Sequence, residues 1–234
     1  MSKLRVALAL GLLSPAPSWA QVGHDPAHSP YRDVSNRTSL VFIGSAVRGS
    51  SGLLEIGPGS GLTYGGRFEM RLTGPTDAFL GISSGSFARL VIDPDAPLAE
   101  RVSGPVDQSV TFVDVGMSIL LTGDKTWYNM APYLGAALGL GFGRAVRTDS
   151  SGFRFNAKFL TGPHIGVRYY ASRSLSFRAE GRLLFWRLKY PSLFFSDPFR
   201  APGQAPVLDA TKQSDTEWTA HPVLVLAVGY ALRL

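Results

Sequence analysis

Two side chains capable of acid–base chemistry, His164 and Glu180, lie on neighbouring segments that share an alternating pattern of apolar and polar residues. A histidine oriented by a carboxylate can activate a serine hydroxyl as a nucleophile. Two residues after His164, however, the sequence has Gly166 and no serine. The sequence therefore does not favour acyl-transfer chemistry at this position, and we expect His164 to be a hydrogen-bonding residue inside the fold.

Charged residues recur on the same face of these alternating segments, and cations outnumber acids among them. Charges in a narrow interior are costly unless they are paired, so we expect Glu69, Asp114 and Glu180 each to lie among arginines. The predicted interior network comprises Arg67, Glu69, Arg71, Asp114, Lys158, His164, Arg168, Arg178, Glu180 and Arg182, and Arg89 and Arg233 are assigned to the same side. A structural ion-pair network is the main interpretation. The excess of cations leaves a narrow, anion-preferring pore as the alternative.

Metal and cofactor chemistry have little support. His24 and His28 are four residues apart with Asp25 between them, but Pro26 disfavours a helix and no third ligand is evident. The chain has no cysteine, so thiolate metal sites and disulfides are excluded. No glycine-rich phosphate loop, nucleophile elbow or zinc spacing is present. We therefore expect no metal, no cofactor and no enzymatic activity.

The elements that must position these charges have a period of two residues, which is typical of β-strands. In the clearest segment, residues 62–73, Leu62, Tyr64, Phe68 and Met70 fall on one face, and Arg67, Glu69 and Arg71 fall on the other. Apolar residues make up 45% of the chain, yet no uninterrupted apolar run of about 18 residues follows residue 20, so a helical membrane span is not expected. High apolar content without spanning helices indicates β-structure.

Eight such segments can be counted, and the even number is what bacterial membrane barrels have. They cover residues 39–48, 62–73, 78–92, 109–121, 132–143, 155–170, 175–185 and 223–234. The segments 39–48 and 78–92 alternate less regularly, and Gly81, Ser83 and Gly85 suggest a β-bulge in the latter. The connections alternate between short (74–77, 122–130, 171–174) and long (49–60, 93–108, 144–152, 191–217). We therefore predict an all-β fold, an eight-stranded antiparallel up-and-down transmembrane β-barrel with short periplasmic turns and long outer loops.

A soluble lipocalin-type barrel is the alternative fold, and it would have its apolar face inside and its charges outside. Here the charges share a face with glycines. The small Gly and Ala residues on one face of segment 132–143 likewise suit a narrow interior. Aromatic residues near segment ends would form interfacial girdles in a membrane barrel. These are Trp127, Tyr128, Tyr133, Tyr169, Tyr170, Trp186, Tyr190 and Trp218.

The first 20 residues have the pattern of a secretory signal peptide. Lys3 and Arg5 precede an apolar stretch, and Ser18 and Ala20 are the small residues that favour cleavage after Ala20. The alternative, a membrane anchor, requires a longer apolar stretch. The polar, proline-containing residues 21–37 then form an extended periplasmic lead-in, and residues 38–234 form the barrel. The net charge of +6 falls by two, to +4, when Lys3 and Arg5 are removed, which is too small to suggest nucleic-acid binding.

Residues 162–182, which read GPHIGVRYYASRSLSFRAEGR, resemble the OmpA-like outer-membrane β-barrel superfamily. The C-terminal octet resembles the signal recognised by the barrel-assembly machinery, through Gly229, Leu232 and Leu234, although Leu234 replaces the usual phenylalanine. The resemblance implies an integral protein of the outer membrane. Outer-membrane lipid and lipopolysaccharide are its expected partners, and a monomer is the expected state, although the sequence does not determine the oligomeric state. We expect no periplasmic peptidoglycan-binding domain after the barrel.

Within that resemblance, a structural or surface-interaction role through the outer loops is the expected function. Small outer-membrane barrels that deacylate lipid A use a His-x-Ser pair, and Gly166 makes a lipid A-modifying enzyme the weaker alternative. The 191–217 loop is the candidate binding surface, with a passive loop as the alternative. It contains Phe194, Phe195 and Phe199 with Pro191, Pro198, Pro202 and Pro206.

Overall fold

The computed structural model describes residues 29–34, 37–97, 99–149, 151–195, 206–209 and 213–232. The expected signal peptide, His24, His28, Phe199, Arg233 and Leu234 lie outside the described residues. In the part of the chain that the structure describes, none of the helical segments has the length and apolarity needed to cross a bilayer.

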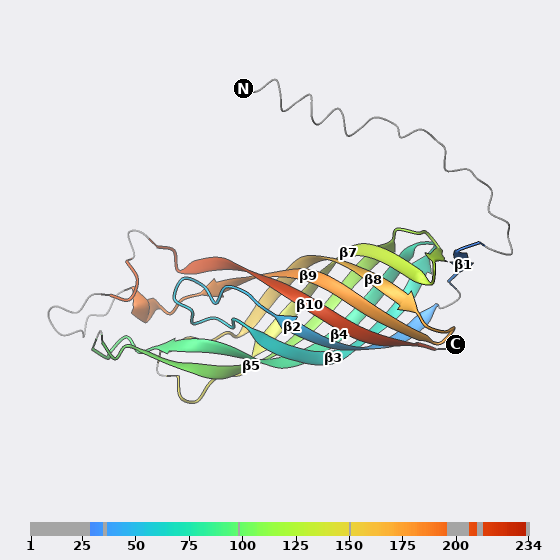
Figure 1. Cartoon of the computed structure of the whole chain (residues 1–234). Helices are drawn as coiled ribbons and strands as arrows, with labels where there is room; N and C mark the ends of the chain where they lie inside the picture. Colours follow the sequence, from blue (N-terminus) through green and yellow to red (C-terminus); the bar gives the residue numbers. More distant parts are fainter. Residues whose placement is uncertain are drawn as a thin grey trace, which may run out of the picture. The chain divides into compact units, whose positions relative to one another are not determined.

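Eight strands form a closed antiparallel barrel (Figure 1). They are β2 (Thr38–Val47), β3 (Gly61–Thr73), β4 (Thr76–Ile92), β5 (Val102–Leu120), β7 (Met130–Gly143), β8 (Ala157–Tyr170), β9 (Leu175–Lys189) and β10 (Thr216–Leu232). Each strand pairs with the next in the chain, and β10 pairs with β2 from Val223↔Val47 to Leu232↔Thr38, which closes the ring. The prediction of an eight-stranded up-and-down barrel is confirmed.

The outer wall of the barrel is apolar. Exposed side chains alternate with buried ones along the strands; on β3, for example, Leu62 and Tyr64 are 73% and 75% exposed, whereas Arg67 and Glu69 are buried. The assignment of the two faces from the sequence is thus confirmed on this strand. Lipid cannot satisfy backbone polar groups, and a closed ring of strands leaves none unpaired along its edges. The apolar exterior and the closed sheet together describe a transmembrane barrel.

The β4–β5 hairpin is longer than the sequence pattern predicts. Residues 93–108 were expected to form a loop, but β5 already begins at Val102. Gly104 and Pro105 look like a turn in the sequence, whereas this stretch is an edge strand, where a proline is tolerated. The strand irregularities fall between Arg71 and Thr73 and between Arg89 and Val91, so the bulge expected near Gly81 is wrong.

Two short strands join at the end of the barrel that carries the short turns. β1 (Tyr31–Asp33) pairs antiparallel with β6 (Lys125–Trp127), and the Val34 N–H donates to the Asp124 carbonyl. Part of the segment expected as an extended lead-in therefore adds a strand to the 122–130 connection. At the opposite end, a 3-10 turn, η2 (Ser192–Phe194), follows β9.

The barrel interior is divided into two regions. Toward the short turns lies a layer of paired charges, which we call the ionic layer; it comprises Arg67, Glu69, Asp77, Asp114, Arg168, Arg178, Glu180 and Arg182. Toward the long loops lies an apolar cluster; it includes Val47, Ile56, Phe87, Val110, Phe112, Phe153, Phe155, Leu160, Trp186, Leu188, Phe194, Leu208, Val223 and Val225. The expectation of a lumen that is polar throughout is therefore wrong for the half nearest the loops.

Several aromatic residues lie on the other face of the wall from the one that the sequence predicts. Phe155 was expected to begin the strand 155–170, with its apolar side chain on the outer face, but it is 1% exposed. The reason is that β8 begins only at Ala157, and Asn156, with a φ of 51°, interrupts the alternation. Of the expected girdle residues, Tyr133, Trp186 and Tyr190 are buried, whereas Trp127, Tyr128, Tyr169 and Trp218 are exposed. The girdle is therefore smaller than predicted.

Candidate functional site in the barrel interior

The ionic layer is built by alternation along strands from opposite sides of the barrel. Arg67 and Glu69 lie on β3, and Arg178, Glu180 and Arg182 lie on β9, each two residues from the next, so each strand points them to the same side. The β3 residues and Glu180 are less than 5% exposed. Charges from two distant parts of the chain thus meet in the lumen.

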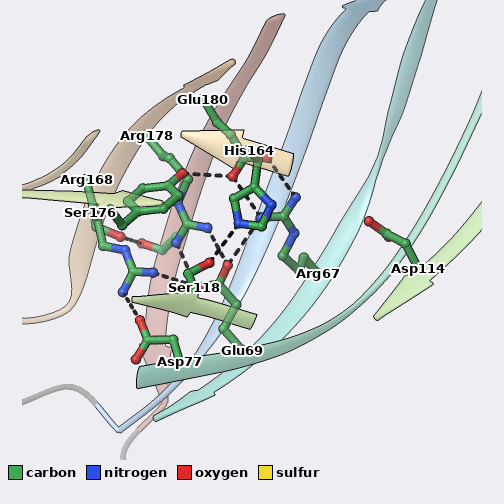
Figure 2. Close-up of polar contacts among 12 residues, drawn as sticks. Arg67, Glu69, Asp77, Asp114, Ser118, His164, Arg168, Ser176, Arg178 and Glu180 are labelled. Carbon is green, nitrogen blue, oxygen red and sulfur yellow. Dashed lines mark hydrogen bonds and ion pairs between the residues drawn. The ribbon is translucent and has the colours of Figure 1, made fainter. Parts of the chain in front are cut away.

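Glu69 forms ion pairs with three arginines (Figure 2). Arg178 binds it through both terminal nitrogens, with Nη2 donating to Oε2 at 2.6 Å. Arg168 Nη2 donates to the same oxygen at 3.1 Å, and Arg67 Nη1 lies 3.6 Å from Oε1. The charge of one buried carboxylate therefore partly balances the charges of three arginines.

Glu180 is the second centre of the layer. Arg67 donates to its two oxygens at 3.3 Å each, and Arg182 Nη2 donates at 2.9 Å. The Tyr133 hydroxyl donates to Oε2 at 2.8 Å. Arg182 also reaches Asp114, with Nη1 at 2.6 Å from Oδ2, so the network crosses from β9 to β5. Arg67 links this group to Glu69, which makes the layer one connected network.

The remaining predicted interior residues lie in different places. Arg71 forms an ion pair with Asp77 at 3.3 Å and donates to the Val34 carbonyl, near the short turns. Lys158 is half-buried, and no ion pair joins it to an acidic residue within the described ranges. Arg89 is not part of the ionic layer. It forms an ion pair with Asp149 at 2.5 Å and lies beside the apolar cluster.

Three partners of the predicted interior residues were not identified from the sequence. Asp77 was assigned to a turn, but β4 begins at Thr76, and Asp77 binds Arg168 at 3.0 Å. The pairing of Arg71 with Asp77 across the turn was the signal that could have identified it. Tyr133 was assigned to the girdle although it falls on the inner face of β7. Ser118, which is buried on β5, was not identified from the sequence as a partner of His164.

Ser118 supplies the hydroxyl that is missing two residues after His164. Its Oγ lies 2.9 Å from His164 Nε2 (Figure 2). Both residues are 5% or less exposed, and the rings of Phe79 and Tyr133 lie 5.7 and 6.1 Å from the imidazole. Glu180 is occupied by two arginines and a tyrosine. The pair has the residue types of a nucleophile and a base, but both side chains are buried in the wall of the barrel interior.

A small cavity separates the two regions of the lumen. It measures about 40 Å³ and is lined by Arg67, Asp114 and Arg182 on the ionic side and by Phe112 and Val225 on the apolar side. A volume of this size holds about one to three water molecules. Packed side chains fill the lumen on both sides of it. No group of three or more metal-ligating side chains was found among the described residues.

The outer loops are attached to the barrel by specific polar contacts. Tyr190 donates to Glu217 at 2.5 Å, and the Leu53 N–H donates to both, at 3.0 and 2.9 Å. Burial, together with the adjacent Glu217 carboxylate, raises the pKa of Tyr190 above its usual value. Asp149 accepts from Arg89 and from Ser151, which fixes the loop that precedes β8. Two of the long loops are thus anchored at specific residues.

Two residues of the C-terminal octet lie within the described part of β10. Gly229 faces inward, where its carbonyl accepts from the Ser176 hydroxyl at 3.4 Å, and Leu232 is the last residue of the strand. These positions are compatible with the expected assembly signal, which stays a prediction.

No protein-family model and no curated protein matches the chain. Among solved structures, the chain is similar to Neisserial surface protein A, with a TM-score of 0.51 and 15% identity over 83% of this chain and 97% of that one. It also resembles the N-terminal β-barrel domain of Pseudomonas aeruginosa OprF (TM-score 0.42, 16% identity, 84% and 99% covered). A third similar structure is Ail, the attachment invasion locus protein of Yersinia pestis (0.40, 9%, 84% and 99%). The first of these likenesses shows that the fold is that of a small outer-membrane barrel.

Proposed function

We propose that this chain is an integral outer-membrane protein that neither conducts ions nor catalyses a reaction, and that it acts as a rigid support for a surface-interaction site at its loop end. The observation that carries the proposal is the filled lumen. The ionic layer closes it toward the short turns, and the apolar cluster closes it toward the loops. Such packing favours a support over a channel, and the buried Ser118–His164 pair argues against a lipid-modifying enzyme.

The β4–β5 hairpin is the part of the loop end best suited to meet a partner. β7 pairs with β5 only as far as Val110, and the Arg144 N–H donates to the Ser109 carbonyl just beyond it. No described strand pairs with Val102–Gln108 on the side away from β4. The hairpin therefore offers an exposed strand edge, with Val102 57% exposed. An exposed edge can accept a strand from a partner. Pro105 in this edge limits uncontrolled pairing.

The 191–217 loop, by contrast, has an anchoring role in this proposal. Phe194 is fully buried in the apolar cluster, and Phe195 packs against it. These aromatic residues are thus turned toward the barrel and away from a partner, whereas Leu193 is 48% exposed. The expected binding surface shifts from this loop to the hairpin.

The expected outer-membrane setting completes the proposal. Short turns on the periplasmic side and long loops outside are the usual arrangement for such barrels. Lipopolysaccharide and the barrel-assembly machinery are the partners that this setting implies, with export by a signal peptide cleaved after Ala20.

The orientation of the barrel can be tested by labelling introduced cysteines, because the chain has no cysteine of its own. We expect Ser103→Cys, on the hairpin, to react with a membrane-impermeant maleimide on intact cells, and Ser172→Cys, in a short turn, to react only after the outer membrane is opened.

The purified protein should give no stable conductance steps in planar bilayers. Its expression should leave the mass of lipid A unchanged. Labelling of Ser172→Cys alone on intact cells, steady conductance, or loss of an acyl chain would each contradict the proposal.

A further inference from the structure

The lipid-facing wall is hollowed along two strands. On β2 the outward positions include Gly44 and Ala46, and on β9 they include Ala179 and Gly181. The strand between them, β10, carries Leu224 and Leu226 outward, 57% and 61% exposed. Small residues thus flank a ridge of leucines on both sides.

The strand register aligns these positions across the wall. Leu224 pairs with Ala46 on one side and with Gly181 on the other, and Leu226 pairs in the same way with Gly44 and Ala179. Neighbouring strands lie about 4.8 Å apart, so the two furrows run side by side about 10 Å from each other. We call these the β2 furrow and the β9 furrow.

The furrows are open space on the surface. A depression of about 800 Å³ is lined by residues of both furrows, by the leucine ridge, and by Pro163 and Pro222. A second one, of about 570 Å³, continues it along Gly44 and Ala179. A Cβ atom added at Gly44 would meet no atom within 4 Å, and one added at Gly181 would approach only the Ile165 carbonyl, at 4.0 Å.

Cations lie on both furrow strands, on the side of the loops. Arg48 is two residues beyond Ala46, and Arg187 is six residues beyond Gly181, with Leu183 and Phe185 on the same face between them. Arg48 follows the last residue of β2, is exposed, and lines the larger depression. On β9, Arg187 and Lys189 are exposed, and Arg187 pairs across the strands with Trp218, which is 60% exposed. Among the outward-facing residues of β8, β9, β10 and β2, all within the described ranges, none is acidic. The wall therefore combines apolar furrows with positive charge at one end.

We propose that this face binds the lipid A part of lipopolysaccharide, with acyl chains in the two furrows and phosphate groups at Arg48 and Arg187. Two parallel furrows suit an amphiphile with several acyl chains. Two cations on strands separated by β10 suit a headgroup with more than one phosphate. The choice of lipid A over a phospholipid rests on the orientation in the proposed function, in which the loop end faces the outer leaflet. Tryptophan at the level of Arg187 fits the membrane interface.

Binding can be measured by native mass spectrometry on the full-length protein in detergent, titrated with lipid A that carries two phosphates and, separately, with phosphatidylglycerol. We expect Arg48→Gln to weaken lipid A binding about fivefold, which is the usual effect of one cation near an anionic lipid surface. Gly44→Leu and Gly181→Leu should weaken it by filling the furrows. Gly66→Leu is the matched control: Gly66 also faces lipid, on β3, and an added Cβ would approach only the Val41 carbonyl, at 3.8 Å. Arg173→Gln, in a short turn, controls for charge.

The outcomes separate the possible occupants of this face. Loss of lipid A binding in the three site variants, with both controls unchanged, supports the site. Equal weakening by Gly66→Leu or by Arg173→Gln, or equal affinity for phosphatidylglycerol, overturns it. A dimer that Gly44→Leu dissociates would assign the face to a second copy of the chain instead. Ser103→Cys labelling on the same variants distinguishes this result from a wrong orientation, because lipid A binding can fail while the hairpin still faces outward.

Discussion

The two halves of the barrel interior are filled through different interactions: ion pairs on the side of the short turns and apolar packing on the side of the loops. In the ionic layer, Glu69 and Glu180 hold arginines from other strands through directional contacts, so each member has named partners. In the apolar cluster, residues such as Phe112 and Trp186 are buried without such pairing, and burial stabilises them roughly in proportion to area. The first region specifies which strands face one another, and the second closes the mouth of the barrel with loop residues. The ionic layer should therefore be intolerant of single changes, and the apolar cluster should be more tolerant.

The largest effect should follow the removal of the acid at the centre of the ionic layer. Glu69→Ala leaves Arg178, Arg168 and Arg67 without one shared carboxylate, and breaking a buried ion pair costs about 3–5 kcal/mol. Urea unfolding in lipid vesicles measures this change. Glu100→Ala, at an exposed loop position, is the control and should leave the unfolding free energy unchanged. Similar unfolding free energies for the two variants would mean that the ionic layer contributes little to the stability of the barrel.

A second test uses the Arg89–Asp149 ion pair, which lies beside the apolar cluster. Asp149→Ala should destabilise the protein by about 3 kcal/mol, because Arg89 stays buried without its carboxylate. The double variant Arg89→Met with Asp149→Leu should recover most of that loss, since apolar residues of similar volume replace a buried pair at little cost. If the double variant is as unstable as the single one, the pair has a role that packing does not replace.

Matched swaps of valine and threonine compare the two regions at constant volume. Val110→Thr introduces a hydroxyl into the apolar cluster and should cost about 1–3 kcal/mol. Thr63→Val, in the lining of the small cavity between the two regions, removes the 2.5 Å contact with the Ser45 hydroxyl and should cost about 0.5–1.5 kcal/mol. Equal losses in the two variants, measured by the same unfolding assay, would contradict a sharp boundary between the regions.

The sequence was sufficient to predict the barrel and the side of the wall on which Arg67, Glu69 and Glu180 lie, because alternation along one strand decides both. It was not sufficient to predict partners, since Glu69 and Arg178 are 109 residues apart and meet only when the ring closes. Trp186 and Tyr133 show a second limit: an aromatic residue near a strand end suits either a girdle or a packed lumen, and only the opposite wall decides. The furrows were likewise invisible, because they depend on the register of β2, β10 and β9.

The smallest effect should appear at the contact that holds a loop over the apolar cluster. Tyr190 has a pKa above its usual value, so the folded state keeps the phenol protonated more strongly than the unfolded state does. The contribution of Tyr190 to stability is therefore fully present below a pH of about 10 and is lost as the pH rises from there toward the higher folded-state pKa. We expect protease cleavage in the loop of residues 49–60 to increase above that pH, as the Leu53–Tyr190–Glu217 contacts are lost. Tyr190→Phe should raise cleavage slightly at neutral pH and abolish this alkaline increase. An unchanged alkaline increase in Tyr190→Phe would show that another group holds the loop, while the apolar cluster beneath it would still be closed by burial alone.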